Sequence, residues 1–138
     1  MTIPVVVVDD NETDRYLVMR RLRKDPVFGE VAEVESGDQF LERYFNDQQA
    51  DTVRDNPLVV LMDVNMPGRN GFETVEEVQQ RVAEGQGPKG MVVMMFTSSN
   101  NPKDLELVQS YELIKGYILK PMDDESLARI RQWVSELD

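Results

Sequence analysis

Short apolar runs alternate along the chain with longer segments whose apolar residues recur at helical spacing. The runs are rich in Val and Met and are apolar at consecutive positions, which is typical of strands buried on both faces of a sheet. They predict five strands, at Val5–Val8, Val31–Val34, Leu58–Met62, Met91–Phe96 and Gly116–Leu119.

Five helical segments follow these runs, and several begin at recognisable start signals. Asn11 and Ser36-Gly37-Asp38 stand where capping residues are expected, and Asn101-Pro102 places Pro at a first helical position. Asp123 or Asp124 is expected to cap the last helix, and the sequence leaves this choice open. The apolar residues expected on the inner helix faces are Leu17, Val18 and Leu22; Phe40, Leu41, Tyr44 and Phe45; Phe72, Val75, Val78 and Val82; Leu105, Val108 and Tyr111; and Leu127, Ile130 and Val134.

A strand followed by a helix, five times over, indicates an α/β fold with a parallel sheet covered by helices on both faces. The polar stretch Asn46–Asn56 is expected to extend a helix and then form a loop. The 138 residues suit one domain, so we expect a single domain over residues 1–138 with no output domain.

Composition excludes several function classes. The net charge is −11, from 26 acidic and 15 basic residues, which argues against nucleic acid as a direct partner. The chain contains no Cys and no His, so disulfides, thiolate chemistry and imidazole ligands or phosphocarriers are excluded. The apolar run near the N-terminus is too short to span a membrane and lacks a basic flank, so we expect a cytoplasmic protein without a membrane partner.

Polar residues follow four of the five strands: Asp9-Asp10, Asp63, Thr97-Ser98-Ser99 and Lys120-Pro121. The carboxyl ends of parallel strands meet at one edge of a sheet, where ligands bind in doubly wound folds. Carboxylates brought together there repel each other by roughly 4 kcal/mol per pair at about 4 Å and an effective dielectric near 20. An all-oxygen cluster of this kind needs a hard cation, and Mg²⁺ is the natural choice.

These residue types together indicate a phosphoryl-transfer site. Asp63 is the candidate nucleophile, because a carboxylate needs no deprotonation at pH 7. The metal and Lys120 would neutralise charge on the transferring group. A hydroxyl beside them would bind phosphoryl oxygens, and spacing alone does not separate Thr97 from Ser98.

Four stretches carry a resemblance to the receiver domain of bacterial two-component response regulators: "VVVVDDNETDRYLV", "LVVLMDVNMPGRNGFE", "VVMMFTSSN" and "GYILKPMDDESL". The resemblance covers essentially the whole chain, in order and at the right spacing. It implies a doubly wound, flavodoxin-like (βα)5 fold with strand order 2-1-3-4-5.

The resemblance also implies a role for each matching acid. Asp63 would be the phosphoacceptor, and Asp10 would bind Mg²⁺ directly. Asp9 would contribute mainly through water, and the backbone carbonyl of Asn65 would be a further ligand. Asn65 and Ser99 occupy the variable positions that flank the site and tune the phosphoryl lifetime.

The remaining matches concern the last two strands. Thr97 would hydrogen-bond the phosphoryl group, Lys120 would form an ion pair with it, and the Lys120–Pro121 bond would be cis. Tyr117 falls at the position of the family's rotamer-switch aromatic, which is paired with Thr97. Taken singly, Asp63 could equally be a turn acid, Thr97 a strand-end hydroxyl, Lys120 a solvated charge and Tyr117 plain core.

The implied partner is a sensor histidine kinase or phosphotransfer protein. The stretches "SYELIKGYILKPMD" and "FTSSN" look most like single-domain regulators paired with phytochrome-type or hybrid kinases. Partner docking or homodimerisation would use the fourth helix, fifth strand and fifth helix. The apolar residues expected to be exposed there are Leu107, Tyr111, Ile114 and Met122. Leu113 replaces a Gly usual at the end of the fourth helix, which predicts a longer or differently shaped helix end.

Two other function classes remain open. A pseudo-receiver would keep this fold as a binding module that is never phosphorylated. An Asp-nucleophile phosphatase of the haloacid dehalogenase type would need a second acid two residues after the nucleophile, and Asn65 stands there instead.

Overall fold

The structure, a computed structural model, describes residues 3–45, 58–87, 90–98 and 100–135. Its centre is a five-stranded sheet in the order β2-β1-β3-β4-β5, in which all neighbouring strands are parallel. The predicted doubly wound fold and strand order are therefore confirmed. The strands are β1 (Ile3–Val8), β2 (Phe28–Val34), β3 (Leu58–Met62), β4 (Met91–Thr97) and β5 (Ile114–Leu119).

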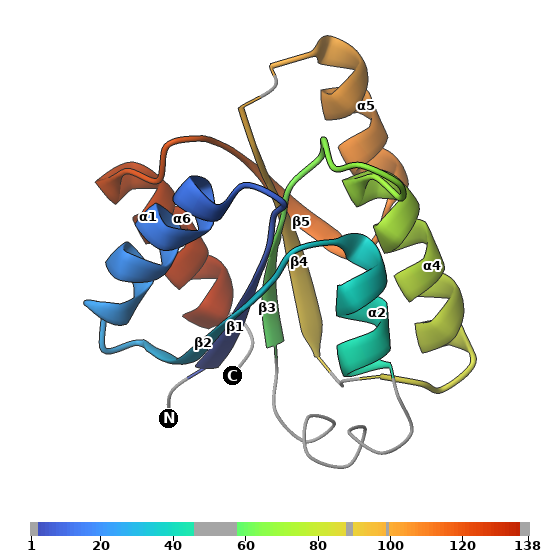
Figure 1. Cartoon of the computed structure of the whole chain (residues 1–138), viewed down its shortest axis with the longest axis horizontal. Coiled ribbons are helices and arrows are strands. Elements are labelled where there is room, and N and C mark those ends of the chain that lie inside the picture. The colour runs from blue at the N-terminus through green and yellow to red at the C-terminus, as the bar shows by residue number, and fades with distance from the viewer. Residues whose placement is uncertain (1–2, 46–57, 88–89, 99, 136–138) are drawn as a thin grey trace.

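Helices cover both faces of the sheet. They are α1 (Glu12–Arg23), α2 (Gly37–Tyr44), α4 (Gly71–Ala83), α5 (Pro102–Ser110) and α6 (Asp124–Ser135). Figure 1 shows α1 and α6 on one face of the sheet and α2, α4 and α5 on the other. Among the described residues, no helix is long and apolar enough to cross a membrane.

The expected helix starts have capping contacts. The side chains of Asn11, Ser36 and Asn101 each accept a hydrogen bond from a backbone N–H in the first turn of the helix that follows. The open choice for the last helix is settled at Asp123, whose carboxylate accepts a hydrogen bond of 2.8 Å from the Ser126 N–H. The start of α4 at Asn70, for which no signal was predicted, is a capping box.

The core consists of two apolar clusters, one on each side of the sheet, because successive strand residues point to opposite faces. The central strand β3 is buried at every position, which explains its continuous apolar run. The edge strands β2 and β5 mix buried and more exposed positions, so the apolar runs predicted only their C-terminal parts.

The inner face of α1 differs from the prediction. Leu17 is 50% exposed, although it was expected to face the core. The buried stripe is instead Arg15, Val18, Met19 and Leu22, which follows the i, i+3, i+4, i+7 rule. The polar residue at the start of this stripe concealed it in the sequence.

The prediction also fails for the last turn of α4 and holds only in part for α5, where Val108 and Tyr111 pack against the core cluster. Val82 is exposed. Helix α5 has no buried residue, Leu105 is exposed, and Val108 and Tyr111 are half-buried. An apolar period shows which side of a helix is apolar but cannot show whether another element covers that side.

Two of the residues expected to be exposed for partner docking are in the core. Ile114 and Met122 are each only 6% exposed, so neither can contact a partner directly. Ile114 begins β5 and packs with the cluster under α4, and Met122 packs with the cluster under α1 and α6. Leu107 is exposed and Tyr111 is half-buried.

The end of α5 shows how Leu113 is accommodated. The helix ends at Ser110, and Tyr111 follows it with φ −115° and ψ 114°, an extended conformation that any residue adopts. A left-handed Gly is therefore not required. The stretch 46–56, predicted to extend a helix and then form a loop, lies outside the described residues.

Candidate functional site

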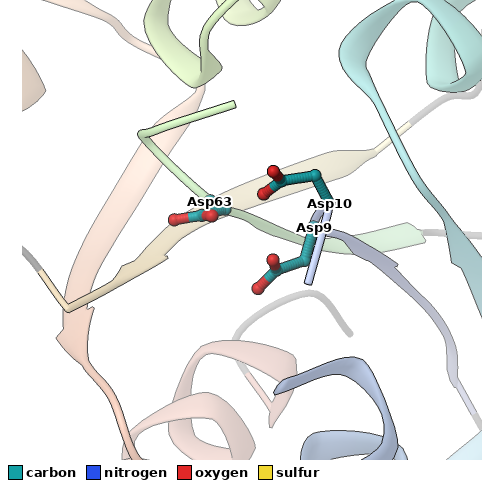
Figure 2. A group of neighbouring side chains, drawn as sticks. All are labelled: Asp9, Asp10 and Asp63. Atoms are coloured by element: carbon teal, nitrogen blue, oxygen red, sulfur yellow. The ribbon is translucent and has the colours of Figure 1, made fainter. Parts of the chain in front are cut away.

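Three carboxylates converge at the carboxyl edge of the two central strands. Asp9 and Asp10 follow β1, and Asp63 follows the neighbouring strand β3. One carboxylate oxygen from each residue lies within 4.8 Å of the others, and Figure 2 shows the three side chains gathered at the strand ends. Asp9 and Asp63 are buried, whereas Asp10 is exposed. The predicted juxtaposition of these acids is present in the structure.

Backbone and capping contacts fix the ends of both strands. The Asp63 N–H donates to the Val8 carbonyl at 2.9 Å, which ties the end of β3 to the end of β1. The Asn11 N–H donates to Asp9 Oδ1 at 2.9 Å, so the residue that caps α1 also orients a site carboxylate. Arg15 Nη1 donates to the Asp9 carbonyl at 2.7 Å, beneath the site.

Lys120 reaches the same cluster from the end of β5. Its Nζ donates hydrogen bonds to Asp9 Oδ2 at 2.6 Å and to Asp14 Oδ2 at 2.8 Å, and it lies 3.7 Å from Asp63 Oδ2. The Lys120 N–H donates to the Thr97 carbonyl at 2.9 Å, and the Lys120–Pro121 peptide bond is cis. Lys120 thus lies among three carboxylates and not in bulk solvent.

Residues 5–131 match the family of response regulator receiver domains. The chain belongs to this family. Receiver domains are parts of two-component response regulators, interact with sensor histidine kinases and are regulatory modules, not conventional enzymes. The resemblance drawn from the sequence is thereby confirmed.

Similar proteins differ in how much of their own length this receiver domain covers. The transcriptional regulatory protein DegU of Brevibacillus brevis is 30% identical over 91% of this chain, which spans about half (47%) of DegU. Protein PilH of Pseudomonas aeruginosa is 27% identical, with 91% of each chain covered. The structure of the bacteriophytochrome response regulator AtBRR is 26% identical, with a TM-score of 0.72 over 98% of this chain and 94% of AtBRR.

Burial and neighbouring charges shift the pKa values of Asp63 and Lys120 in the site. The pKa of the Asp63 carboxyl is raised to about 6 by burial and by the charge of Asp9, against the lowering effects of Lys120 and the Asn65 and Val64 N–H groups. Burial lowers the pKa of the Lys120 ammonium, but its hydrogen bonds to Asp14 and Asp9, together with the charges of Asp63 and Asp9, outweigh burial and leave that pKa raised.

The donor set fits a hard divalent cation. Three converging carboxylates, two of them buried, have one ammonium to offset their charge, and that ammonium is shared with Asp14. Oxygen ligands are those that Mg²⁺ prefers, and a cation there would offset the burial and the repulsion from Asp9 that raise the pKa of Asp63. Asn65 is exposed in the loop two residues after Asp63.

Thr97 and Tyr117 share one face of the sheet. Tyr117 pairs with Met95 across β4 and β5, and Thr97 pairs with Leu119. Because side chains alternate along a strand, Thr97 and Tyr117 are diagonal neighbours on the face that packs against α4 and α5. Thr97 is fully buried and Tyr117 is half-buried. Ser98 is exposed, and Ser99 lies outside the described residues.

Gly71 lets the start of α4 approach the backbone of the nucleophile candidate. A Cβ atom added to Gly71 would lie 2.2 Å from the Asp63 carbonyl oxygen, which is backbone and cannot move aside. The Gly71 N–H donates to the Val64 carbonyl at 2.9 Å. The glycine therefore closes the loop that follows Asp63 into a compact turn.

Sequence reasoning missed three residues of this site: Asp14, Arg15 and Gly71. Asp14 has the pattern of an ordinary first-turn acid that stabilises a helix N-terminus. Arg15 could have been found from its place on the stripe it shares with Val18 and Leu22. No local pattern shows that Gly71 meets Asp63.

Proposed function

We propose that this chain is a stand-alone response regulator that accepts a phosphoryl group on Asp63. The observation that supports this most strongly is the convergence of buried Asp63 with Asp9, Asp10 and Lys120 at one strand edge. The donor would be a phosphohistidine of a sensor kinase or phosphotransfer protein. The likeness to AtBRR, a bacteriophytochrome response regulator, favours a phytochrome-type kinase as partner.

Mg²⁺ would be held by the carboxylates of Asp10 and Asp63 and by the backbone carbonyl of Asn65, with Asp9 acting mainly through water. When bound, it would supply positive charge to phosphoryl oxygens and offset the carboxylate cluster. The three side chains already lie close enough to share one ion.

The chain's own residues would perform a direct displacement. A carboxylate oxygen of Asp63 attacks phosphorus, the O–P bond forms, and the P–N bond to the donor histidine breaks with its electron pair left on the imidazole. Lys120, 3.7 Å from Asp63, neutralises charge on the transferring group. Hydrolysis later returns the carboxylate, and Asn65 and Ser99 would tune how fast water reaches it.

Phosphorylation would act as a switch through the shared sheet face. A phosphoryl group on Asp63 would attract the Thr97 hydroxyl, and Tyr117, its diagonal neighbour, would move into the space that Thr97 leaves. The equilibrium between the two states shifts only by the difference in their interactions with the phosphoryl group.

The output surface would comprise α5, β5 and α6 and would bind a partner protein or a second copy. Helix α5 carries exposed Leu105 and Leu107 and has no fully buried residue, which suits a surface that changes partners. The Tyr111 ring stacks on Phe72 with centroids 6.0 Å apart, which connects this surface to α4.

The deciding experiment is incubation with Mg²⁺ and acetyl phosphate, followed by intact mass measurement. We expect one phosphoryl adduct that requires Mg²⁺ and is absent from Asp63→Asn. Absence of the adduct together with absence of Mg²⁺ binding would favour the pseudo-receiver. Continuous release of phosphate from a phosphomonoester would favour the phosphatase.

A further inference from the structure

Three carboxylates surround the Lys120 ammonium among the residues that the structure describes. Asp9 and Asp63 were expected from the sequence, and Asp14 was not. Lys120 Nζ lies 2.8 Å from Asp14 Oδ2 and 2.6 Å from Asp9 Oδ2, whereas Asp63 Oδ2 lies farther away, at 3.7 Å. The ammonium therefore bridges a site carboxylate at the end of β1 and the first turn of α1.

The position of Asp14 is fixed by the same turn that orients Asp9. The Asp14 N–H donates to Asn11 Oδ1 at 2.9 Å, and the Asn11 N–H donates to Asp9 Oδ1 at 2.9 Å. The Asp14 side chain is 36% exposed, whereas that of Asp9 is 3% exposed. Asp14 thus lies at the rim of the site, next to the buried carboxylates.

This placement matters when a cation occupies the site. A cation that engages Asp9 competes with Lys120 for the same carboxylate, and a partly buried ammonium that loses its partner pays a desolvation cost. Asp14 offers Lys120 a second carboxylate outside the three-acid cluster. The ammonium can keep an ionic partner while Asp9 turns to the cation.

We propose that Asp14 is a positioning residue that retains Lys120 beside the site and thereby frees Asp9 for a divalent cation. This inference rests on the proposed Mg²⁺ site but concerns a residue outside it. It assigns the first turn of α1 a role in metal affinity that acts through Lys120.

The test is calorimetric titration of the unphosphorylated protein with Mg²⁺. Asp14→Asn should weaken Mg²⁺ binding about threefold to fivefold, the upper range that a partly exposed ion pair supports. Glu12→Gln is the matched control, because Glu12 is an exposed acid in the same helical turn and makes no ion pair among the described residues. It should change the affinity less than twofold, an estimate based on screening of exposed charges.

A double-mutant cycle separates this role from simple loss of charge. In a Lys120→Met background, Asp14→Asn should weaken Mg²⁺ binding no more than Glu12→Gln does, because no ammonium remains to be held. An equal effect of Asp14→Asn with and without Lys120 would overturn the inference, as would unchanged affinity in the single variant. Absence of Mg²⁺ binding by the unmodified protein would instead reject the metal site itself. Asp14→Ala repeats the test if the Asn variant does not fold.

Discussion

The acidic edge of β1 and β3 and the helix α5 differ in how deeply their residues are buried. At the acidic edge, Asp9 and Asp63 directly follow strands that are buried almost completely, and a backbone hydrogen bond joins the strand ends. Helix α5 has no buried residue and carries exposed Leu105 and Leu107. Dense burial suits a site whose side chains must keep a fixed geometry, and low burial suits a surface that changes conformation.

Gly71→Ala should strongly lower stability, because the added Cβ would lie 2.2 Å from the Asp63 carbonyl oxygen. We expect a loss of about 3 kcal/mol in the free energy of unfolding, the upper range for forcing atoms into a packed site. Urea denaturation monitored by circular dichroism measures it. Gly68→Ala is the control, because Gly68 has φ +75° but no atom within 4 Å of an added Cβ. A loss in Gly71→Ala no larger than that in Gly68→Ala would contradict the close approach to Asp63 as its cause, because Gly71 itself has no positive φ.

Ionised Asp63 should lower the free energy of unfolding when no metal is bound. Its folded pKa of about 6 lies above the usual value of 3.8, so an uncharged Asp63 favours folding and this advantage is lost as the pH rises through 6. In EDTA at pH 8, Asp63→Asn should raise the free energy of unfolding by about 2 kcal/mol, somewhat less than the full pKa shift allows.

Two conditions sharpen that prediction. At pH 4 the gain from Asp63→Asn should nearly vanish, because the carboxyl is then mostly protonated in the native state. Excess Mg²⁺ should stabilise the unmodified protein by about 2.7 kcal/mol at one hundred times its dissociation constant. A gain that is the same at pH 4 and pH 8 would contradict a role for the carboxylate charge.

The same contrast explains which features the sequence predicted. Central strands and their terminal acids were predictable, because a strand buried on both faces needs a continuous apolar run and the next polar residue marks its end. Asp9, Asp10 and Asp63 were found in this way, and Lys120 was found at the end of the edge strand β5. Asp14 could not be found, since its importance depends on a side chain 106 residues away in the sequence.

The errors fall where burial depends on a neighbouring element. Leu17 and Leu105 fit helical periods but are exposed, while Ile114 and Met122 were assigned to the surface and are buried. Arg15 is buried through a hydrogen bond to the Asp9 carbonyl and an ion pair with Glu33, contacts that a hydrophobic pattern does not reveal. Apolar periodicity identifies a helix, but the packing partner decides which face is covered.

The smallest effect on stability is expected on α5. Leu107→Ala should change the free energy of unfolding by less than about 0.5 kcal/mol, because Leu107 is 40% exposed and truncating it leaves no cavity. The matched control is Ile114→Ala, whose side chain is 6% exposed and whose truncation should cost about 3 kcal/mol.

If α5 contributes to the output surface, Leu107→Ala should nevertheless weaken self-association of the phosphorylated protein in sedimentation velocity, or its binding to a partner. Unchanged association would exclude Leu107 from that surface. A large loss of stability in Leu107→Ala would show instead that α5 is covered in solution, and the contrast with the acidic edge would then fail.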